Sequence, residues 1–290
     1  MSVHSSARWR IHVVNWKRLV SFLVILVLSI TALILLLVNL SRSSRPYKAD
    51  ELSEERFSAL SMYFELEKDM EVPWHYLAAI DLAEGTPLTE ISRERSAQIA
   101  LHLTGLTDEE QLPALLAGYN DDKAFLRKVQ REIKALSGLR AVYDNKTFPF
   151  AADVEYAYED GYGDARSYGG ERSHEGIDLM AEENTPILSV CDGVIEKVGW
   201  NELGGYRIGI RGQDKIYYYY AHMCCYEGNP KEGDKVKKGQ LIGYVGDTGY
   251  GPEGTTGKFL PHLHFGMYYG KGGRLSAFNP YPFLKAWEKS

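Results

Sequence analysis

The distribution of hydrophobic and polar residues divides the chain into stretches with three different patterns. Residues 19–40 form a run without a charged side chain, which is long enough to cross the ~30 Å hydrocarbon core of a membrane as a helix. Residues 51–147 carry apolar side chains at helical spacing. In residues 148–290, short β-type runs alternate with glycine-containing turns. The pattern predicts one transmembrane helix, then a small α-helical region, then a mainly antiparallel β domain.

The uncharged run is interpreted as a retained single-pass anchor in the cell membrane. Residues 1–18 contain no acidic residue but several basic ones, so the positive-inside rule places this tail in the cytoplasm. A cleaved signal peptide is the alternative, but its apolar core would be shorter and would end at small residues. This run ends at Leu40-Ser41-Arg42 instead. Residues 41–50 then form a linker, and the rest of the chain is expected outside the cytoplasm.

Start and stop signals subdivide the helical region. Pro73 is suited to the start of a helix, and Thr107-Asp108-Glu109-Glu110 resembles a capped helix start. A last amphipathic helix, ending near Gly138, is expected from the apolar positions Phe125, Val129, Ile133 and Leu136. The region could act as a spacer, as an inhibitor, or as a docking site for a partner in a membrane complex.

One helical stretch has two interpretations. Residues 72–84 resemble the helix that carries the catalytic Glu of lysozyme-type transglycosylases, which would give Glu84 a role as proton donor. The Gly- and Gln-containing pattern that follows in those enzymes is missing, and Gly85 marks a helix end. We therefore favour a structural helix. His75 and His102 are interpreted as structural or surface residues.

The β domain is expected to be an antiparallel sheet or sandwich, because its strands recur with glycine turns between them. The strand candidates are residues 187–190, 194–198, 207–210, 216–221 and 241–245. Residues 217–220 are four tyrosines, two on each face of a strand. One pair could line a groove near His222; packing and sheet propensity are the favoured explanation.

Composition narrows the choice of function. The net charge of −6 argues against a general nucleic-acid surface. Three cysteines are too few for a disulfide scaffold. A bridge from Cys191 to Cys224 or Cys225 is the alternative to three buried or unremarkable thiols, which we favour.

The histidines of the β domain lie in three short motifs. Residues 148–290 contain four histidines. The motifs are His174-Glu175-Gly176-Ile177-Asp178, Tyr220-Ala221-His222-Met223 and His262-Leu263-His264. Residues two apart on a strand share a face, so His262 and His264 project together. His174 and Asp178 share a face on a strand or on a helix, and the interruption by Gly176 favours a strand. We interpret the motifs as one zinc site built on a β-sheet.

This interpretation agrees with the coordination chemistry of zinc. Zinc binds imidazole nitrogen and carboxylate oxygen tetrahedrally, and a catalytic site leaves the fourth position to water. Two His ligands and one Asp ligand would leave the ion with a net positive charge, which favours bound hydroxide.

The set of motifs resembles the M23 family of zinc metallopeptidases, the lysostaphin and LytM type that cuts peptidoglycan peptides. The family pattern is His-x-x-x-Asp, a middle His after an aromatic-rich strand, and a late His-x-His, and the resemblance covers roughly residues 150–290. Further matching segments are residues 162–166, 193–195, 233–240, 246–249 and 279–280. The resemblance implies that His174, Asp178 and His264 bind one Zn²⁺ per chain and that His222 and His262 are catalytic.

The resemblance also suggests where substrate would bind. Arg166, in the lead-in to the first motif, and Tyr220, before the middle His, are the candidate substrate-binding residues. The groove walls are expected from the loops at residues 160–173, 200–206 and 247–260. The chain departs from the family at Leu260, where Gly is frequent, and at Gly266, where Glu is frequent. Neither departure removes a ligand.

These observations predict a membrane-anchored zinc endopeptidase that hydrolyses stem or cross-link peptides of peptidoglycan and binds no nucleic acid. The alternative is a catalytically silent scaffold of the same fold that binds cell wall or a membrane-complex partner. Scaffolds of this kind typically lack a ligand, whereas this chain retains all five key residues.

Overall fold

The computed structural model describes residues 54–86, 91–168, 170–271 and 274–288. The predicted cytoplasmic tail, membrane span and linker lie outside this part of the chain. No helix among the described residues has the length and hydrophobicity needed to cross a membrane. The described residues belong to one compact unit, Pro46–Ser290.

The first part of this unit is helical, as predicted. Its α-helices are α2 (Glu54–Met70), α3 (Trp74–Glu84), α4 (Arg93–His102), α5 (Leu112–Leu116) and α6 (Lys123–Tyr143). Pro73 is the residue before α3, and Asp108 with Gln111 forms a capping box on the short 3-10 turn Glu109–Gln111. Both start signals seen in the sequence are therefore confirmed.

The end of α6 differs from the prediction. The helix continues through Gly138 to Tyr143, although glycine in a helix interior costs about 1 kcal/mol relative to alanine. Leu139 and Val142 explain the difference, because both are buried in the core. Burial of two apolar side chains outweighs the local preference.

A buried carboxylate, Asp81, joins three of these helices. Tyr63 on α2 and Ser96 on α4 each donate a hydrogen bond to Asp81 Oδ2, at 2.7 and 3.0 Å. Arg95 Nε donates to Oδ1 at 2.9 Å. Asp81 is fully buried, and its partners satisfy both oxygens, as a buried charge requires.

Glu84 is not placed as a transglycosylase acid would be. It forms an ion pair with Arg95 and accepts a hydrogen bond of 2.6 Å from the Tyr119 hydroxyl. A catalytic acid of that class is kept protonated by an apolar pocket, whereas Glu84 is held by a guanidinium. The structure therefore favours the structural interpretation of α3.

We predict that Asp81→Ala destabilises the folded chain by about 3 kcal/mol, because it leaves Arg95 and two hydroxyl groups without their buried acceptor. Glu65→Ala is the matched control, since it removes an exposed carboxylate paired with Arg93. That change should alter stability by less than about 1 kcal/mol. Urea unfolding of both variants measures the difference, and equal effects would contradict a special role for Asp81.

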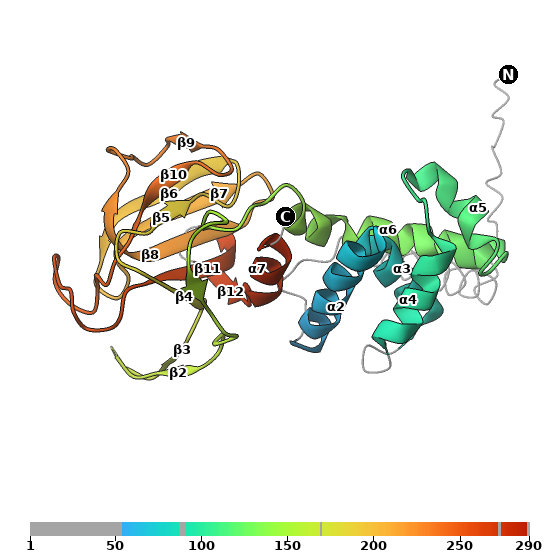
Figure 1. Cartoon of the computed structure of the whole chain (residues 1–290), viewed down its shortest axis with the longest axis horizontal. Coiled ribbons are helices and arrows are strands. Elements are labelled where there is room, and N and C mark those ends of the chain that lie inside the picture. The colour runs from blue at the N-terminus through green and yellow to red at the C-terminus, as the bar shows by residue number, and fades with distance from the viewer. Residues whose placement is uncertain (1–53, 87–90, 169, 272–273, 289–290) are drawn as a thin grey trace, which may run out of the picture. The chain divides into compact units, whose positions relative to one another are not determined.

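The second part of the unit is a mainly antiparallel sheet, as predicted (Figure 1). Its strands are β1 (Tyr156–Ala157), β4 (Ile177–Ala181), β5 (Pro186–Leu188), β6 (Gly193–Asn201), β7 (Gly205–Gly212), β8 (Tyr217–Tyr226), β9 (Lys235–Val236), β10 (Leu241–Val245), β11 (His262–Lys271) and β12 (Arg274–Phe278). The main order is β1-β4-β11-β8-β7-β6-β9. Strand β10 pairs with β5 and β8, and β12 pairs with β11.

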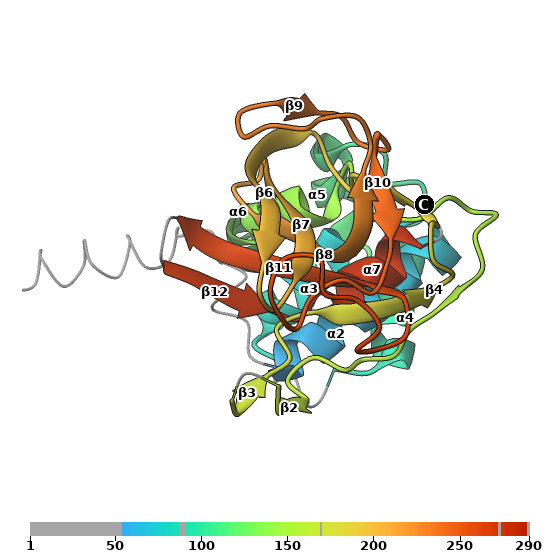
Figure 2. The same ribbon diagram turned by 90° about the vertical axis from the view of Figure 1, so that its left-hand side faces the viewer.

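Two further features frame this sheet. Strands β2 (Ala165–Arg166) and β3 (Arg172–Ser173) form a separate hairpin, which lies on the β4 side of the sheet in both views (Figures 1 and 2). Helix α7 (Tyr281–Trp287) follows β12 and contacts α2. The indole nitrogen of Trp287 donates a hydrogen bond of 3.1 Å to the carbonyl of Tyr143 at the end of α6.

The three adjacent strands β4, β11 and β8 carry most of the predicted site. In the register of the sheet, His264 lies opposite Asp178 on β4 and opposite Ala221 on β8. Ile177 and Leu179 are fully buried, so Asp178 between them projects from the other face. The alternation that buries the core side chains thus brings the polar ones together.

The cysteines agree with the favoured interpretation of unlinked thiols. All three are free, and Cys191 is buried. Burial raises the pKa of the Cys191 thiol to about 12. Cys224 and Cys225 are neighbours on β8, with their sulfur atoms 3.3 Å apart.

Candidate active site

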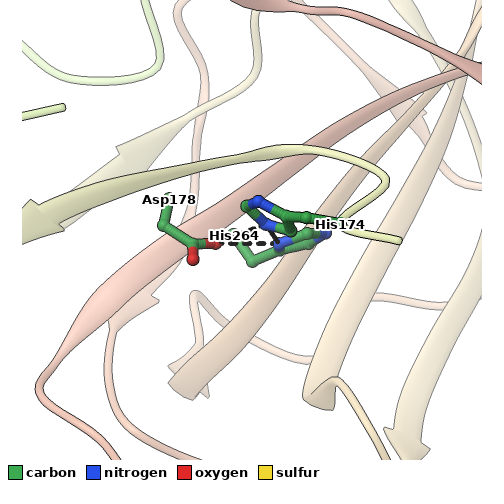
Figure 3. A group of neighbouring side chains, drawn as sticks. All are labelled: His174, Asp178 and His264. Atoms are coloured by element: carbon green, nitrogen blue, oxygen red, sulfur yellow. Dashed lines mark hydrogen bonds and ion pairs between the residues drawn. The ribbon is translucent and has the colours of Figure 1, made fainter. Parts of the chain in front are cut away.

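His174, Asp178 and His264 form a compact group (Figure 3). One potential metal-ligand atom of each residue lies within 4.8 Å of those of the other two. Asp178 Oδ1 is 3.0 Å from His174 Nε2 and 2.9 Å from His264 Nδ1. The two ring nitrogens are 3.0 Å apart. Two imidazole nitrogens and one carboxylate oxygen that converge in this way fit the ligand set of a metal such as zinc.

The residues around His174 set its tautomer and its position. Its Nδ1–H donates to the carbonyl of Gly161 at 2.8 Å, which leaves the lone pair of Nε2 for the group. A Cβ atom at Gly176 would lie 2.6 Å from the Phe265 carbonyl oxygen and 2.7 Å from the His264 ring. Glycine is therefore required between the first two ligand candidates, which explains part of the motif.

Arg166 holds the second oxygen of the carboxylate. Its Nη2 donates to Asp178 Oδ2 at 2.7 Å and also lies 2.9 Å from His174 Nδ1. Burial alone would raise the pKa of Asp178, but its interactions with His174 and His264 outweigh burial and keep that pKa well below its usual range. Asp178 is therefore ionised, with Oδ1 turned to the two histidines and Oδ2 to Arg166.

His222 and His262 form a second pair beside this group. Their ring centroids are 4.8 Å apart, and both side chains are buried. Each Nδ1–H donates to a backbone carbonyl at 2.7 Å, that of Thr248 for His222 and that of Leu260 for His262. These bonds leave Nε2 of each ring for other contacts, and His262 Nε2 lies 3.7 Å from Asp178 Oδ1.

The backbone at His222 departs from regular strand geometry. Its φ is +62°, a region that costs non-glycine residues about 1–3 kcal/mol and often marks a functional position. The pairing registers of β8 with β7 and with β10 both shift near this residue, and bulges of this kind re-aim side chains. Burial, and next the nearby His262, hold the pKa of His222 well below its ordinary value, so its ring is neutral.

A pocket of about 400 Å³ opens over the two groups. Its walls come from the three loops expected from the sequence, and its other lining includes side chains of β8 and β11. The lining side chains outside the five key residues include Arg166, Arg172, Asn201, Leu203, Tyr219, Tyr250, Phe259 and Tyr268. The arrangement provides a group that could hold a metal ion and two further imidazoles in one groove.

Comparisons with known proteins find similarity to peptidases over the part of the chain that forms this site. The model of Peptidase family M23 matches residues 172–279. The L-Ala--D-Glu endopeptidase of Bacillus subtilis (strain 168) is 49% identical over 142 residues, which are 49% of this chain and 44% of that protein. Lysostaphin of Staphylococcus simulans is 36% identical over 115 residues, 39% of this chain and 22% of that protein. The chain thus spans less than half the length of these curated relatives.

A solved structure extends the match beyond the β domain. The lytM structure from Ruminococcus gnavus ATCC 29149 has a TM-score of 0.53 and 30% identity, and the alignment covers 85% of this chain and 90% of that one. The chain belongs to peptidase family M23. The resemblance read from its motifs is confirmed.

In this M23 protein the five key residues come together, whereas one of the two predicted substrate-binding residues lies away from the pocket. Tyr220 is fully buried, and its hydroxyl accepts a hydrogen bond of 2.9 Å from Val190 N inside the core. The prediction that Tyr220 faces the groove is wrong, and Tyr219 lines the pocket in its place. Arg166 does line the pocket, but its guanidinium is engaged by Asp178.

The sequence did not single out several other groove residues of the M23 site. Arg172 is on the hairpin that carries Arg166, and Tyr250 and Phe259 lie in the loop before β11. Their ring centroids are 5.9 and 4.5 Å from that of His222. Tyr250 and Phe259 lie inside the predicted wall segment 247–260, and aromatic residues in a predicted wall were the signal that could have identified them.

Proposed function

We propose that this chain is a membrane-anchored zinc metalloendopeptidase that hydrolyses peptide bonds in peptidoglycan. The observation that carries the proposal is the convergence of the His174, Asp178 and His264 donor atoms beside two further imidazoles in one pocket. M23 relatives named as an L-Ala--D-Glu endopeptidase and as lysostaphin support the class of reaction.

His174, Asp178 and His264 would hold the zinc ion. When bound, zinc would supply Lewis-acid polarisation of the scissile carbonyl and a lowered pKa of water. Arg166 keeps the Asp178 carboxylate in place through Oδ2, and the Gly161 carbonyl keeps His174 in the required tautomer. Outer contacts of this kind orient the ligands of a metal.

His222 and His262 would transfer the proton of the attacking water and stabilise the negative charge that develops on the oxyanion. A neutral ring with a free Nε2 can accept a proton from the attacking water and later pass it to the leaving amine. The second ring, 4.8 Å away between centroids, can donate a hydrogen bond to the oxyanion once its Nε2 carries a proton. Because backbone carbonyls fix both Nδ1–H groups, neither ring needs to reorient during the reaction.

The stem peptide is the favoured substrate. The Bacillus subtilis relative named for the L-Ala–D-Glu bond is 49% identical, against 37% for the glycyl-glycine endopeptidase ALE-1 of Staphylococcus capitis. We therefore propose that the bond cleaved lies between L-Ala and D-Glu. Residues 19–40 would anchor the chain with its N-terminus in the cytoplasm and residues 148–290 outside, where peptidoglycan lies. The helical region would be free to dock a membrane-complex partner.

The alternative of a silent scaffold is less well supported. Such a protein would be expected to lack a ligand or to misplace one, whereas all five residues are present and close together.

Digestion of purified cell walls with the full-length chain in detergent tests the proposed function. Mass spectrometry should detect a new N-terminal D-Glu after incubation with zinc, and His174→Ala should release none. A wild-type chain that binds zinc but releases no new amine from walls or from soluble stem peptides would contradict the proposal.

A further inference from the structure

The hairpin of β2 and β3 carries two arginines with different partners. Arg166 forms an ion pair with Asp178. Arg172 instead donates to two uncharged oxygens, from Nε to the Tyr168 carbonyl at 3.2 Å and from Nη2 to the Tyr250 hydroxyl at 3.0 Å. Within the described part of the chain, no carboxylate forms an ion pair with Arg172.

The position of Arg172 is fixed by the aromatic wall of the groove. The rings of Tyr168 and Tyr250 are stacked, with centroids 4.2 Å apart and planes 2° apart. Tyr250 in turn contacts Phe259 and His222, with centroid distances of 4.9 and 5.9 Å. The hairpin is therefore tied across the groove to the wall beside His222, and it holds the Arg172 guanidinium in the pocket lining.

No negative charge in the pocket neutralises the Arg172 guanidinium. The other charged residues that line the pocket are Arg166, Asp178 and Glu175. The first two neutralise each other at 2.7 Å, and Glu175 is exposed to solvent. A guanidinium that is held in place, partly buried and unpaired is suited to a carboxylate ligand, which it can bind through two parallel N–H groups.

We propose that Arg172 is a specificity-determining residue that binds a carboxylate of the substrate next to the scissile bond. This inference rests on the proposed function. In an L-Ala–D-Glu bond the second residue carries two carboxyl groups, so one remains beside the bond when the other continues the chain. Arg172 would distinguish a free carboxylate at that position from its amide, because an amide cannot accept two charge-assisted bonds.

Two synthetic stem peptides that differ only in this group test the proposal. One has D-Glu with a free carboxylate after L-Ala, and the other has the corresponding primary amide. The wild-type chain should cleave the carboxylate peptide with a kcat/KM at least about tenfold higher, since a site built for a polar group discriminates strongly against analogues that lack it. Arg172→Gln should lower kcat/KM for the carboxylate peptide about 10–100-fold and leave the amide peptide within about threefold.

Matched variants separate recognition from structural and charge effects. Arg172→Lys keeps the charge but not the planar fork, so it should restore part of the preference. Lys197→Gln removes a cation from an exposed ion pair with Glu232 and should leave the preference unchanged. Zinc content should be the same in all four chains.

Two results would overturn this proposal alone. If Arg172→Gln slows both peptides equally, Arg172 only supports the groove wall. If the wild-type chain cleaves both peptides at equal rates, the carboxylate is not recognised; in both cases the proposed endopeptidase function stands. A wild-type chain that cleaves neither peptide nor intact walls would overturn the proposed function together with this inference.

Discussion

Alanine at His174, Asp178 or His264 is expected to remove the bound zinc and to abolish hydrolysis. Each change leaves only two of the three protein ligands, and a catalytic zinc site of this type requires three. The three residues meet on the sheet face opposite the buried Ile177 and Leu179, so the apolar core is retained and the variants should fold.

Metal analysis after dialysis against a weak chelator measures the effect. The wild-type chain should retain about one zinc per chain, and each ligand variant should retain close to none. Glu175→Ala is the matched control, because it removes an exposed carboxylate three residues before Asp178. Full retention of zinc by His174→Ala would show that the ligand assignment is wrong.

Arg166 should give a graded response in the same experiment. Its contact with Asp178 Oδ2 orients a ligand without itself binding the metal. Loss of such an outer contact typically weakens metal affinity about 10–100-fold. Arg166→Gln should therefore bind zinc in excess metal but lose it to a chelator that leaves the wild-type site intact.

The positions of Asp178 and His264 could be predicted from sequence because β4 and β11 are regular strands, whereas His174 lies between β3 and β4 and not on the strand that the sequence favoured. Along β4 the buried side chains of Ile177 and Leu179 alternate with Asp178, and along β11 Leu263 is buried between the two histidines of its motif. A period of two therefore places the polar side chains on one face. Periodicity alone does not define which strand pairs with β4. The resemblance to the family motif indicated that the His262-Leu263-His264 segment lies beside Asp178.

The wall of the groove could not be predicted in the same way. On a regular strand, Tyr220 would share a face with His222. The φ of +62° at His222 and the register shifts beside it break this rule, so Tyr219 reaches the pocket and Tyr220 the core. Nothing in the local sequence marks such an irregularity, because it depends on the pairing of β8 with both neighbours.

The contacts of the hairpin and the end of α6 could not be predicted either, because both depend on tertiary contacts. Arg166 and Arg172 lie in a short glycine-containing segment, and arginine is usually exposed. Only the tertiary structure shows that Arg166 pairs with Asp178 and that Arg172 contacts Tyr250. Gly138 predicted the end of α6, but burial of Leu139 and Val142 outweighs this local preference and the helix continues to Tyr143. Local propensity is a weak guide where long-range packing decides.

Loss of the His222 or the His262 imidazole, the two proposed catalytic groups, is expected to lower kcat about 10²–10⁴-fold while zinc stays bound. His262→Ala removes one ring. For the other, His222→Asn is the better variant than alanine, since asparagine tolerates the positive φ of this position and the loss then reports on the ring alone. Neither side chain belongs to the group that would hold the metal, so each variant should retain about one zinc per chain.

The double variant should be only slightly slower than the slower single variant. The two rings lie 4.8 Å apart and would act on one water and one oxyanion, and residues that act as a unit are strongly non-additive. His102→Ala, at an exposed histidine of α4, is the control and should cleave the carboxylate stem peptide at the wild-type rate. Near wild-type kcat in His222→Asn or His262→Ala, or loss of zinc from either during dialysis, would show that ligands and catalytic residues have been divided incorrectly.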